Sequence, residues 1–246
     1  MNSSFSGKSA IDKGTAMVEK ELFDEWPERY NQWFMTPIGK LIKKIESDLI
    51  KDLSGPFQGE TILDAGCGTG IFTVDFLATA VKIVGLDISV PMLNLAIKKT
   101  NGDKFSAVRG DMTYLPFKDN SFDNTISITA LEFIADAKSA ISELFRVTRP
   151  GGYVVVATLN SLSPWATRRK RKIEMGQKHI LEKAFFRSPK ELLDCTAYSG
   201  FTKTVIHFQK DDDPDRAIQI EQIGQFKGLD TGAFVAARWQ KTGFVS

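Results

Sequence analysis

Three glycines at alternate positions, directly after a short apolar run, constrain this chain more than any other feature. Residues 61–65 read Thr-Ile-Leu-Asp-Ala, then come Gly66, Gly68 and Gly70, and a helix-like run follows over 71–80. This order predicts a buried strand, a tight turn and a helix start. The glycines let backbone N–H groups approach a ligand closely, and a helix N-terminus favours negative charge. The spacing G-x-G-x-G matches the dinucleotide fingerprint G-x-G-x-x-G only imperfectly.

Three further apolar runs each end in polar residues. The run after the glycines ends in Asp87, about 20 residues on, where an acidic strand end meets the ribose of a bound nucleotide. The run at 105–108 is followed by Asp111, and the run at 122–128 by Glu132. Ligands of open α/β sheets bind at the carboxyl ends of the strands. The sequence therefore predicts a largely parallel sheet with a nucleotide-like ligand at that edge.

The residues in these runs resemble those of class I S-adenosylmethionine (AdoMet)-dependent methyltransferases. The matching segments are LDAGCGTG, GLDIS with the following ML and A, GDMTYLPF, SFDNTISITALEFI and RVTRPGGYVVVATLN. The nearest type is methyltransferase type 11, which includes the ubiquinone and menaquinone biosynthesis enzymes. The resemblance covers roughly residues 60–160 and is loose elsewhere. It is consistent with a Rossmann-like, seven-stranded, mostly parallel sheet with helices on both faces and an antiparallel last strand.

The resemblance implies a role for each matching residue in binding AdoMet or its product S-adenosylhomocysteine (AdoHcy). The glycine turn would lie under the methionine portion, with Asp64 near its ammonium group. Asp87 would accept hydrogen bonds from the two ribose hydroxyls, and Asp111 from the adenine amino group. The full implied set of AdoMet contacts is Tyr30, Asp64, Gly66, Cys67, Gly68, Asp87, Ile88, Met92, Asp111, Met112, Thr129 and Leu131.

Methyl transfer is an in-line displacement, so positioning and exclusion of water can supply most of the rate. The nearest candidate for a catalytic base is Glu132, with His179 and Tyr30 behind it. Alternatively, Glu132 only complements the dipole of a helix start. Two other functions stay open: a non-catalytic AdoMet-binding or regulatory protein, and an NAD-dependent oxidoreductase. The glycine spacing and the Gly-Asp-Met after the third strand disfavour the oxidoreductase.

The chain has 246 residues, 42% hydrophobic and 25% charged, which suits one α/β domain with a sizeable core. We expect a disordered lead over 1–15 and a single methyltransferase domain over the rest. Within it we expect a helical cap at 16–55, an AdoMet-binding core at 56–160, a basic lid or acceptor region at 161–190, and the C-terminal part of the sheet at 191–246. The apolar spacing predicts a helix over 137–147 in the core. In the C-terminal part, the sequence predicts a helix that begins at Pro189 and ends at Gly200, a strand over 202–208 and a short amphipathic stretch near Ile220.

The cap contains an aromatic segment followed by an amphipathic run over 38–53. It could simply pack on the sheet. Alternatively, Tyr30 and Trp33 could wall the transferred methyl group and the acceptor. The second interpretation is favoured by the similarity of ERYNQWF to the Y-D-x-W-F segment of such enzymes, although Asn31 replaces the usual acid.

The region 161–190 holds nine Lys or Arg against two Glu. The unbroken run Arg168 to Lys172 cannot share one helix face, so some of its charges must point to solvent. The interleaved aromatic residues Trp165, Phe185 and Phe186 favour a lid over an acidic or aromatic acceptor. Nucleic acid is disfavoured as a partner, because one basic run without a binding fold indicates little.

No apolar run approaches the length of a membrane span, and the polar N-terminus lacks a signal core, so we expect a cytoplasmic protein. The two cysteines, Cys67 and Cys195, are expected to be reduced thiols. With only His179 and His207 and no metal-spaced cluster, we expect no metal site. We further expect a small-molecule acceptor and a monomer or homodimer.

Overall fold

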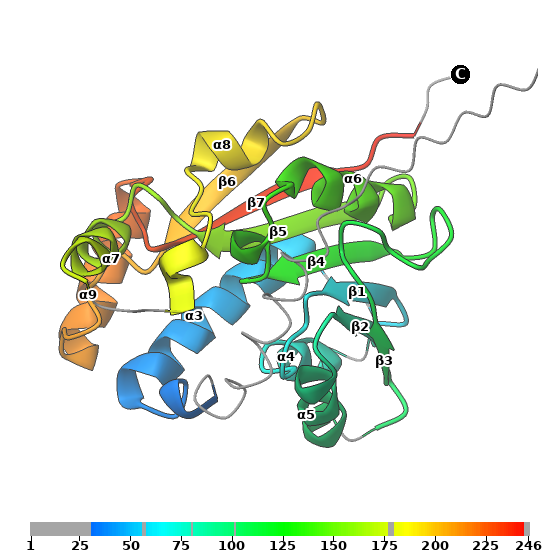
Figure 1. Ribbon diagram of the computed structural model, residues 1–246, viewed down its shortest axis with the longest axis horizontal. Coiled ribbons are helices and arrows are strands. Elements are labelled where there is room, and N and C mark those ends of the chain that lie inside the picture. Colours follow the sequence, from blue (N-terminus) through cyan, green and yellow to red (C-terminus); the bar gives the residue numbers. More distant parts are fainter. Residues whose placement is uncertain (1–30, 56–57, 80, 101, 177–179, 244–246) are drawn as a thin grey trace, which may run out of the picture.

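Seven strands form one sheet in the order β3-β2-β1-β4-β5-β7-β6. The computed structural model describes residues 31–55, 58–79, 81–100, 102–176 and 180–243 (Figure 1). The strands are β1 (Thr61–Ala65), β2 (Lys82–Asp87), β3 (Phe105–Arg109), β4 (Asn124–Ile128), β5 (Tyr153–Leu159), β6 (Gly200–Val205) and β7 (Phe234–Gln240). All neighbours pair in parallel except β7, which runs antiparallel to both β5 and β6. The predicted Rossmann-like α/β fold, with its antiparallel last strand, is confirmed.

Helices cover both faces of the sheet, as predicted. They are α3 (Pro37–Ser54), α4 (Thr73–Leu77), α5 (Val90–Thr100), α6 (Ala137–Val147), α7 (Pro164–Glu174), α8 (Pro189–Leu193) and α9 (Pro214–Phe226), with 3₁₀ turns η1 (Leu131–Phe133) and η2 (Ile180–Lys183). The packing of α3, α4 and α9 makes one core layer, whereas α6 and α8 make the other (Figure 1). No helix in the described part of the chain is long and apolar enough to cross a membrane.

The two core layers follow from the alternation of side chains along each strand. In β5, Val155 packs in the layer with α3, and its neighbours Val154 and Val156 pack in the layer with α6. All three are buried, as a parallel strand covered on both faces requires.

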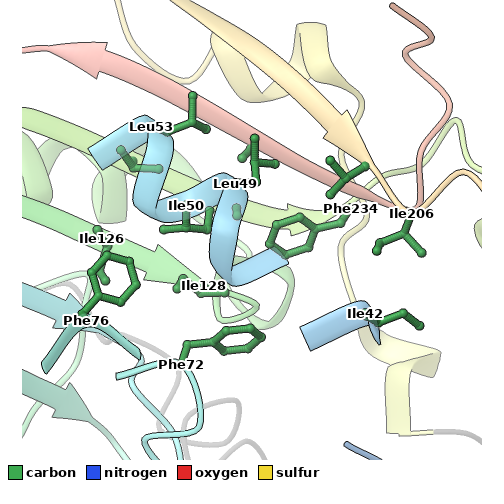
Figure 2. Close-up of a cluster of buried hydrophobic side chains, with 14 of the residues drawn as sticks. Ile42, Leu49, Ile50, Leu53, Phe72, Phe76, Ile126, Ile128, Ile206 and Phe234 are labelled. Carbon is green, nitrogen blue, oxygen red and sulfur yellow. The ribbon is translucent and has the colours of Figure 1, made fainter. Parts of the chain in front are cut away.

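The helix α3 packs an apolar stripe onto the sheet. Thr36 caps its start by accepting the Gly39 N–H (3.1 Å), Pro37 occupies the first turn, and Gly55 ends it in a left-handed conformation (φ +52°). Figure 2 shows Ile50 of α3 among labelled core residues from α3, from 72–76, from β4, from the end of β6 and from β7. The described part of the predicted helical cap is therefore an ordered cover for the sheet. The predicted lead and the cap before residue 31 lie outside the described residues.

Several expected boundaries differ from those observed in the C-terminal third. Strand six was expected at 202–208, but β6 ends at Val205, because Ile206 adopts a left-handed backbone conformation (φ +67°) that a strand cannot continue. The short amphipathic stretch near Ile220 is the full helix α9. Its start is capped by Asp213, whose carboxylate accepts the N–H of Asp215 (3.0 Å). The helices α4 and α8 are each shorter than expected.

Candidate active site

A cavity of about 770 Å³ opens at the carboxyl edge of the parallel strands. Its walls come from the turns after β1, β2, β3 and β4, and from α3 and α7. Ligand pockets of proteins usually measure about 300–1,000 Å³, so the volume suits a nucleoside-sized ligand together with a small acceptor. The predicted site residues that line it are Gly66, Cys67, Gly68, Asp87, Ile88, Met92, Asp111, Met112, Thr129 and Glu132.

The glycine turn has a backbone that only glycine adopts readily. Gly66 and Gly68 have φ of +78° and +53°, and a Cβ on Gly66 would collide with the Cβ of Ala130. The N–H groups of Gly66 and Cys67 both donate to the carbonyl of Leu86 at the end of β2 (2.7 and 3.0 Å). The turn is thus fixed to the neighbouring strand, with its backbone against the cavity, as predicted from the glycine spacing.

The carboxylate of Asp87 is held in place on both sides. Its Oδ2 accepts the Gly68 N–H (2.8 Å) and its Oδ1 accepts the Ser89 N–H (2.9 Å). The side chain therefore links the glycine turn to the end of β2, and it lies at the cavity wall.

Asp64 lies beneath the glycine turn and is not part of the cavity wall. It is only 2% exposed, and its Oδ2 accepts the hydroxyl of Thr73 (2.7 Å). Burial raises the pKa of Asp64 to about 7, against the Thr73 hydrogen bond, and the charge of Asp87 adds to the rise. Leu131 is also fully buried outside the wall. Neither side chain lines the cavity, and the roles that the family resemblance implies for them stay predictions.

Met92 and Met112 are buried on one side of the cavity, near Asp111. The Oδ1 atom of Asp111 accepts both the N–H and the hydroxyl of Thr113 (2.8 and 2.7 Å), which orients the carboxylate. Two thioether side chains and a fixed acceptor suit a flat, apolar ring with an amino group at its edge. This part of the wall matches the adenine contacts that the family resemblance implied.

Thr129, at the end of β4, carries strain at the cavity wall. It is β-branched and yet has φ of +50°, a conformation that such residues rarely adopt. Its N–H donates to the carbonyl of Ala157 in β5 (2.9 Å), which holds the turn in that shape. Strained backbone of this kind clusters at functional sites and is sustained by the surrounding structure.

Glu132 is buried in the 3₁₀ turn η1, and its carboxyl lines the cavity. It is 2% exposed, and its Oε2 accepts the hydroxyl of Thr158 (2.9 Å). Burial raises the pKa of Glu132 to about 7, although the Thr158 hydrogen bond and the charges of Arg187 and Arg169 oppose the rise. A three-residue turn carries little helix dipole, so that alternative explanation for the residue loses its basis. The other catalytic candidates, Tyr30 and His179, lie outside the described residues.

The basic run contributes one side chain to the cavity. Arg169 is half-buried and lines the wall, with its guanidinium 5.4 Å from the centre of the Phe186 ring. Arg168 pairs with Asp211 at the surface (2.9 Å), and the rest of the run, 170–172, is exposed. The run therefore has one residue at the site and four that face solvent. This is expected, because five consecutive residues cannot lie on one face of a helix.

The aromatic residues interleaved with the basic run divide in the same way. Trp165 lines the cavity, and its indole N–H donates to the carbonyl of Phe208 (2.6 Å). Phe185 is 45% exposed and does not line it, whereas Phe186 supports Arg169. Only Trp165 of the three aromatic residues is thus placed to contact a ligand in this cavity.

Glu46 of α3 lines the cavity, although it is not among the site residues predicted from the sequence. Its position carried a readable signal, because it lies on the apolar face of the helix, four residues after Ile42 and four before Ile50. Burial raises the pKa of Glu46 well above its usual value, and the charge of Glu132 adds to the rise. Lys210, after β6, also lines the cavity and was likewise missed.

Comparison with known proteins indicates the family of this chain. Residues 63–156 match the family described as "Methyltransferase domain". The chain is 30% identical over 225 residues to an uncharacterised protein of Methanocaldococcus jannaschii. The aligned region covers 89% of this chain and 98% of that protein. It is 40% identical over 104 residues to a malonyl-[acyl-carrier protein] O-methyltransferase of Erwinia billingiae, which covers 42% and 41%. This chain belongs to the class I AdoMet-dependent methyltransferases.

The methyltransferase spans about half the length of the curated relatives it matches first, which are malonyl-[acyl-carrier protein] O-methyltransferases and demethylmenaquinone methyltransferases. Among solved structures, it shares its fold with a Thermotoga maritima protein described as an AdoMet-dependent methyltransferase and possible histamine N-methyltransferase. That likeness has a TM-score of 0.68 at 23% identity and covers 91% of this chain and all of the other. The family predicted from the motifs is confirmed.

Proposed function

We propose that the chain is an enzyme that moves the methyl group of AdoMet to a small-molecule acceptor by in-line displacement. The observation that carries this proposal is one cavity that joins a glycine turn, a doubly held Asp87 and a buried Glu132. AdoMet, when bound, supplies a methyl group on a cationic sulfur, which the acceptor attacks from the opposite side.

The residues present fit AdoMet. The backbone of Gly66 to Gly68 would contact its methionine portion, since all three residues of this turn line the cavity. Asp87, whose carboxylate is positioned by the N–H groups of Gly68 and Ser89, would accept hydrogen bonds from the ribose hydroxyls. Asp111, with Met92 and Met112, would hold the adenine. Asp64 would act from below the turn on the ammonium group, through Thr73 or water.

The rest of the cavity would hold the acceptor. Its wall there is largely apolar, with Trp33 from the cap, Leu159 from β5, and Trp165 from α7. This lining supports an acceptor with an apolar or aromatic body. The acidic acceptor expected from the basic run has less support, because Arg169 is the one residue of that run at the wall and the charge of Glu132 already acts on it.

Calorimetry with AdoMet and AdoHcy tests the proposal. We expect both to bind in the micromolar range and NADH to give no heat. Transfer of label from AdoMet should then be screened across acidic, phenolic and amine metabolites. Absence of heat and of any thermal shift with both AdoMet and AdoHcy would remove the proposed activity. A cytoplasmic location and a monomeric or homodimeric state stay predictions, to be tested by fractionation and light scattering.

A further inference from the structure

Glu46 is a buried carboxyl at the cavity wall, and the described part of the chain offers it no hydrogen-bond partner. It is 7% exposed and lies on the face of α3 that packs on the sheet. Among the described residues, no hydrogen bond or ion pair reaches its carboxylate, although the side chain lines the cavity. Burying a carboxyl without a partner is costly, so such a group is retained where a ligand supplies the partner.

A second carboxyl, Glu132, faces the same cavity from the sheet edge. The two groups are near enough for the charge of Glu132 to raise the pKa of Glu46. One oxygen of Glu132 accepts the hydroxyl of Thr158 (2.9 Å), which fixes the carboxyl in position. Two like-charged groups converging in a largely apolar cavity attract a cation and repel an anion.

Arg169 and Lys210 also line the cavity, but the charge of Lys210 is a cause of the pKa shift of neither Glu46 nor Glu132. Arg187 and Arg169 both lower the pKa of Glu132, whereas burial and Glu132 account for the shift at Glu46. The guanidinium of Arg187 is itself engaged, since it donates to the carbonyls of Leu131 (2.8 Å) and Ile134 (2.7 Å). None of the described residues whose charge shifts the pKa of Glu46 is positive. A ligand can supply the positive charge that Glu46 needs.

Building on the proposed function, we propose that the methyl acceptor is an amine whose cationic nitrogen is held between Glu46 and Glu132. An ammonium group offers several N–H donors and a positive charge to the two carboxyls. A hydroxyl offers one donor, and a carboxylate offers none. The apolar body of the amine would lie against the indole rings of Trp33 and Trp165 and the side chain of Leu159.

The same arrangement prepares the nitrogen for reaction. Glu132 takes one proton from the ammonium, and the freed lone pair forms the bond to the methyl carbon of the donor. The electron pair of the broken carbon–sulfur bond stays on the sulfur of the neutral thioether product. The product leaves as an N-methylated ammonium ion, and Glu132 returns its proton to water. A pKa of about 7 suits Glu132 to this exchange near neutral pH.

The test compares three probes of similar size: 2-phenylethylamine, 2-phenylethanol and 3-phenylpropanoate. Each is titrated by calorimetry at pH 7.5 into the full chain saturated with AdoHcy, which leaves only the acceptor end of the cavity. We expect the amine to bind at least about tenfold more tightly than the alcohol, and the carboxylate most weakly. In Glu46→Gln this preference should fall to roughly threefold or less, whereas the exposed control Glu174→Gln should keep it.

Equal binding of amine and alcohol to the unmodified chain would overturn the inference, and this arm needs no variant. An amine preference that survives in both Glu46→Gln and Glu132→Gln, with thermal melts showing folded proteins, would also overturn it. The heat of AdoHcy binding is recorded first. If the chain binds no AdoHcy, the proposed function is wrong. Titration of the three probes into the free chain still tests the amine site separately.

Discussion

Replacing Asp87 with Ala is the most direct test of how this site holds AdoMet. In the structure each oxygen of Asp87 accepts a backbone N–H at the cavity wall, and in the proposed complex the carboxylate accepts the two ribose hydroxyls. The change would remove two hydrogen bonds to a charged acceptor, each worth about 1.5–3 kcal/mol. A loss of about 3 kcal/mol corresponds to about a 150-fold weaker Kd. We therefore expect the affinity for AdoHcy to fall by at least tenfold while the chain stays folded.

The assay is calorimetric titration of AdoHcy, with circular dichroism and thermal melts to confirm folding. Asp103→Asn is a matched control, because Asp103 is exposed and lies outside the cavity wall. Asp87→Asn adds a second comparison, since it keeps the shape but places an amide N–H against one of the two backbone donors. An unchanged Kd in folded Asp87→Ala would refute the assignment of the second strand end to the ribose.

Three further predictions concern stability and the basic run. Because burial raises the pKa of Asp64 to about 7, the folded protein keeps this carboxyl protonated at pH values where the unfolded chain ionises it. The free energy of unfolding, relative to that of Asp64→Asn, should therefore fall by up to roughly 4 kcal/mol between pH 4 and pH 7. Urea denaturation of both proteins at pH 4 and 7 measures it, and a difference that does not change with pH would contradict the burial argument. Ile50→Ala removes a fully buried side chain between α3 and the sheet and should cost about 2–5 kcal/mol in the same assay. Neutralising residues 170–172 should change the free energy of unfolding by less than about 0.5 kcal/mol and leave the acceptor KM unchanged. Arg169→Gln should alter the acceptor KM, because Arg169 lines the cavity. If both variants changed the KM equally, and with the same dependence on salt, the run would act as one charged surface.

Much of this architecture could be predicted because local patterns and tertiary needs agree. The apolar run before Asp64 had to be a buried strand, and only a turn with φ above zero could follow it at Gly66. Asp87 could be placed at the same edge because parallel strands end together. The helix α6 begins and ends at the residues that its apolar spacing predicted, Ala137 and Val147.

The acceptor end of the cavity could not be predicted in the same way. Its residues come from α3, α7 and the end of β6, which are distant in sequence and meet only through the packing of the sheet. The helix spacing indicates the buried position of Glu46 on the apolar face of α3, but it does not indicate the cavity that the residue lines. Arg169 could not be told from Arg168, because the phase of a helix with so few apolar residues is set by contacts such as those of Trp165.

The place of β7 in the sheet has a consequence for how the chain is made. This strand is the last in the sequence, yet it lies between β5 and β6 and pairs with both. During synthesis, β6 emerges from the ribosome some thirty residues before its sheet neighbour exists, and β5 waits with one edge unpaired. The strands that carry the glycine turn and Asp87 need no such delay. We therefore expect the cofactor half to acquire its shape while the chain is still growing. The acceptor half, which includes Ala233 just before β7, can close only after β7 has been made.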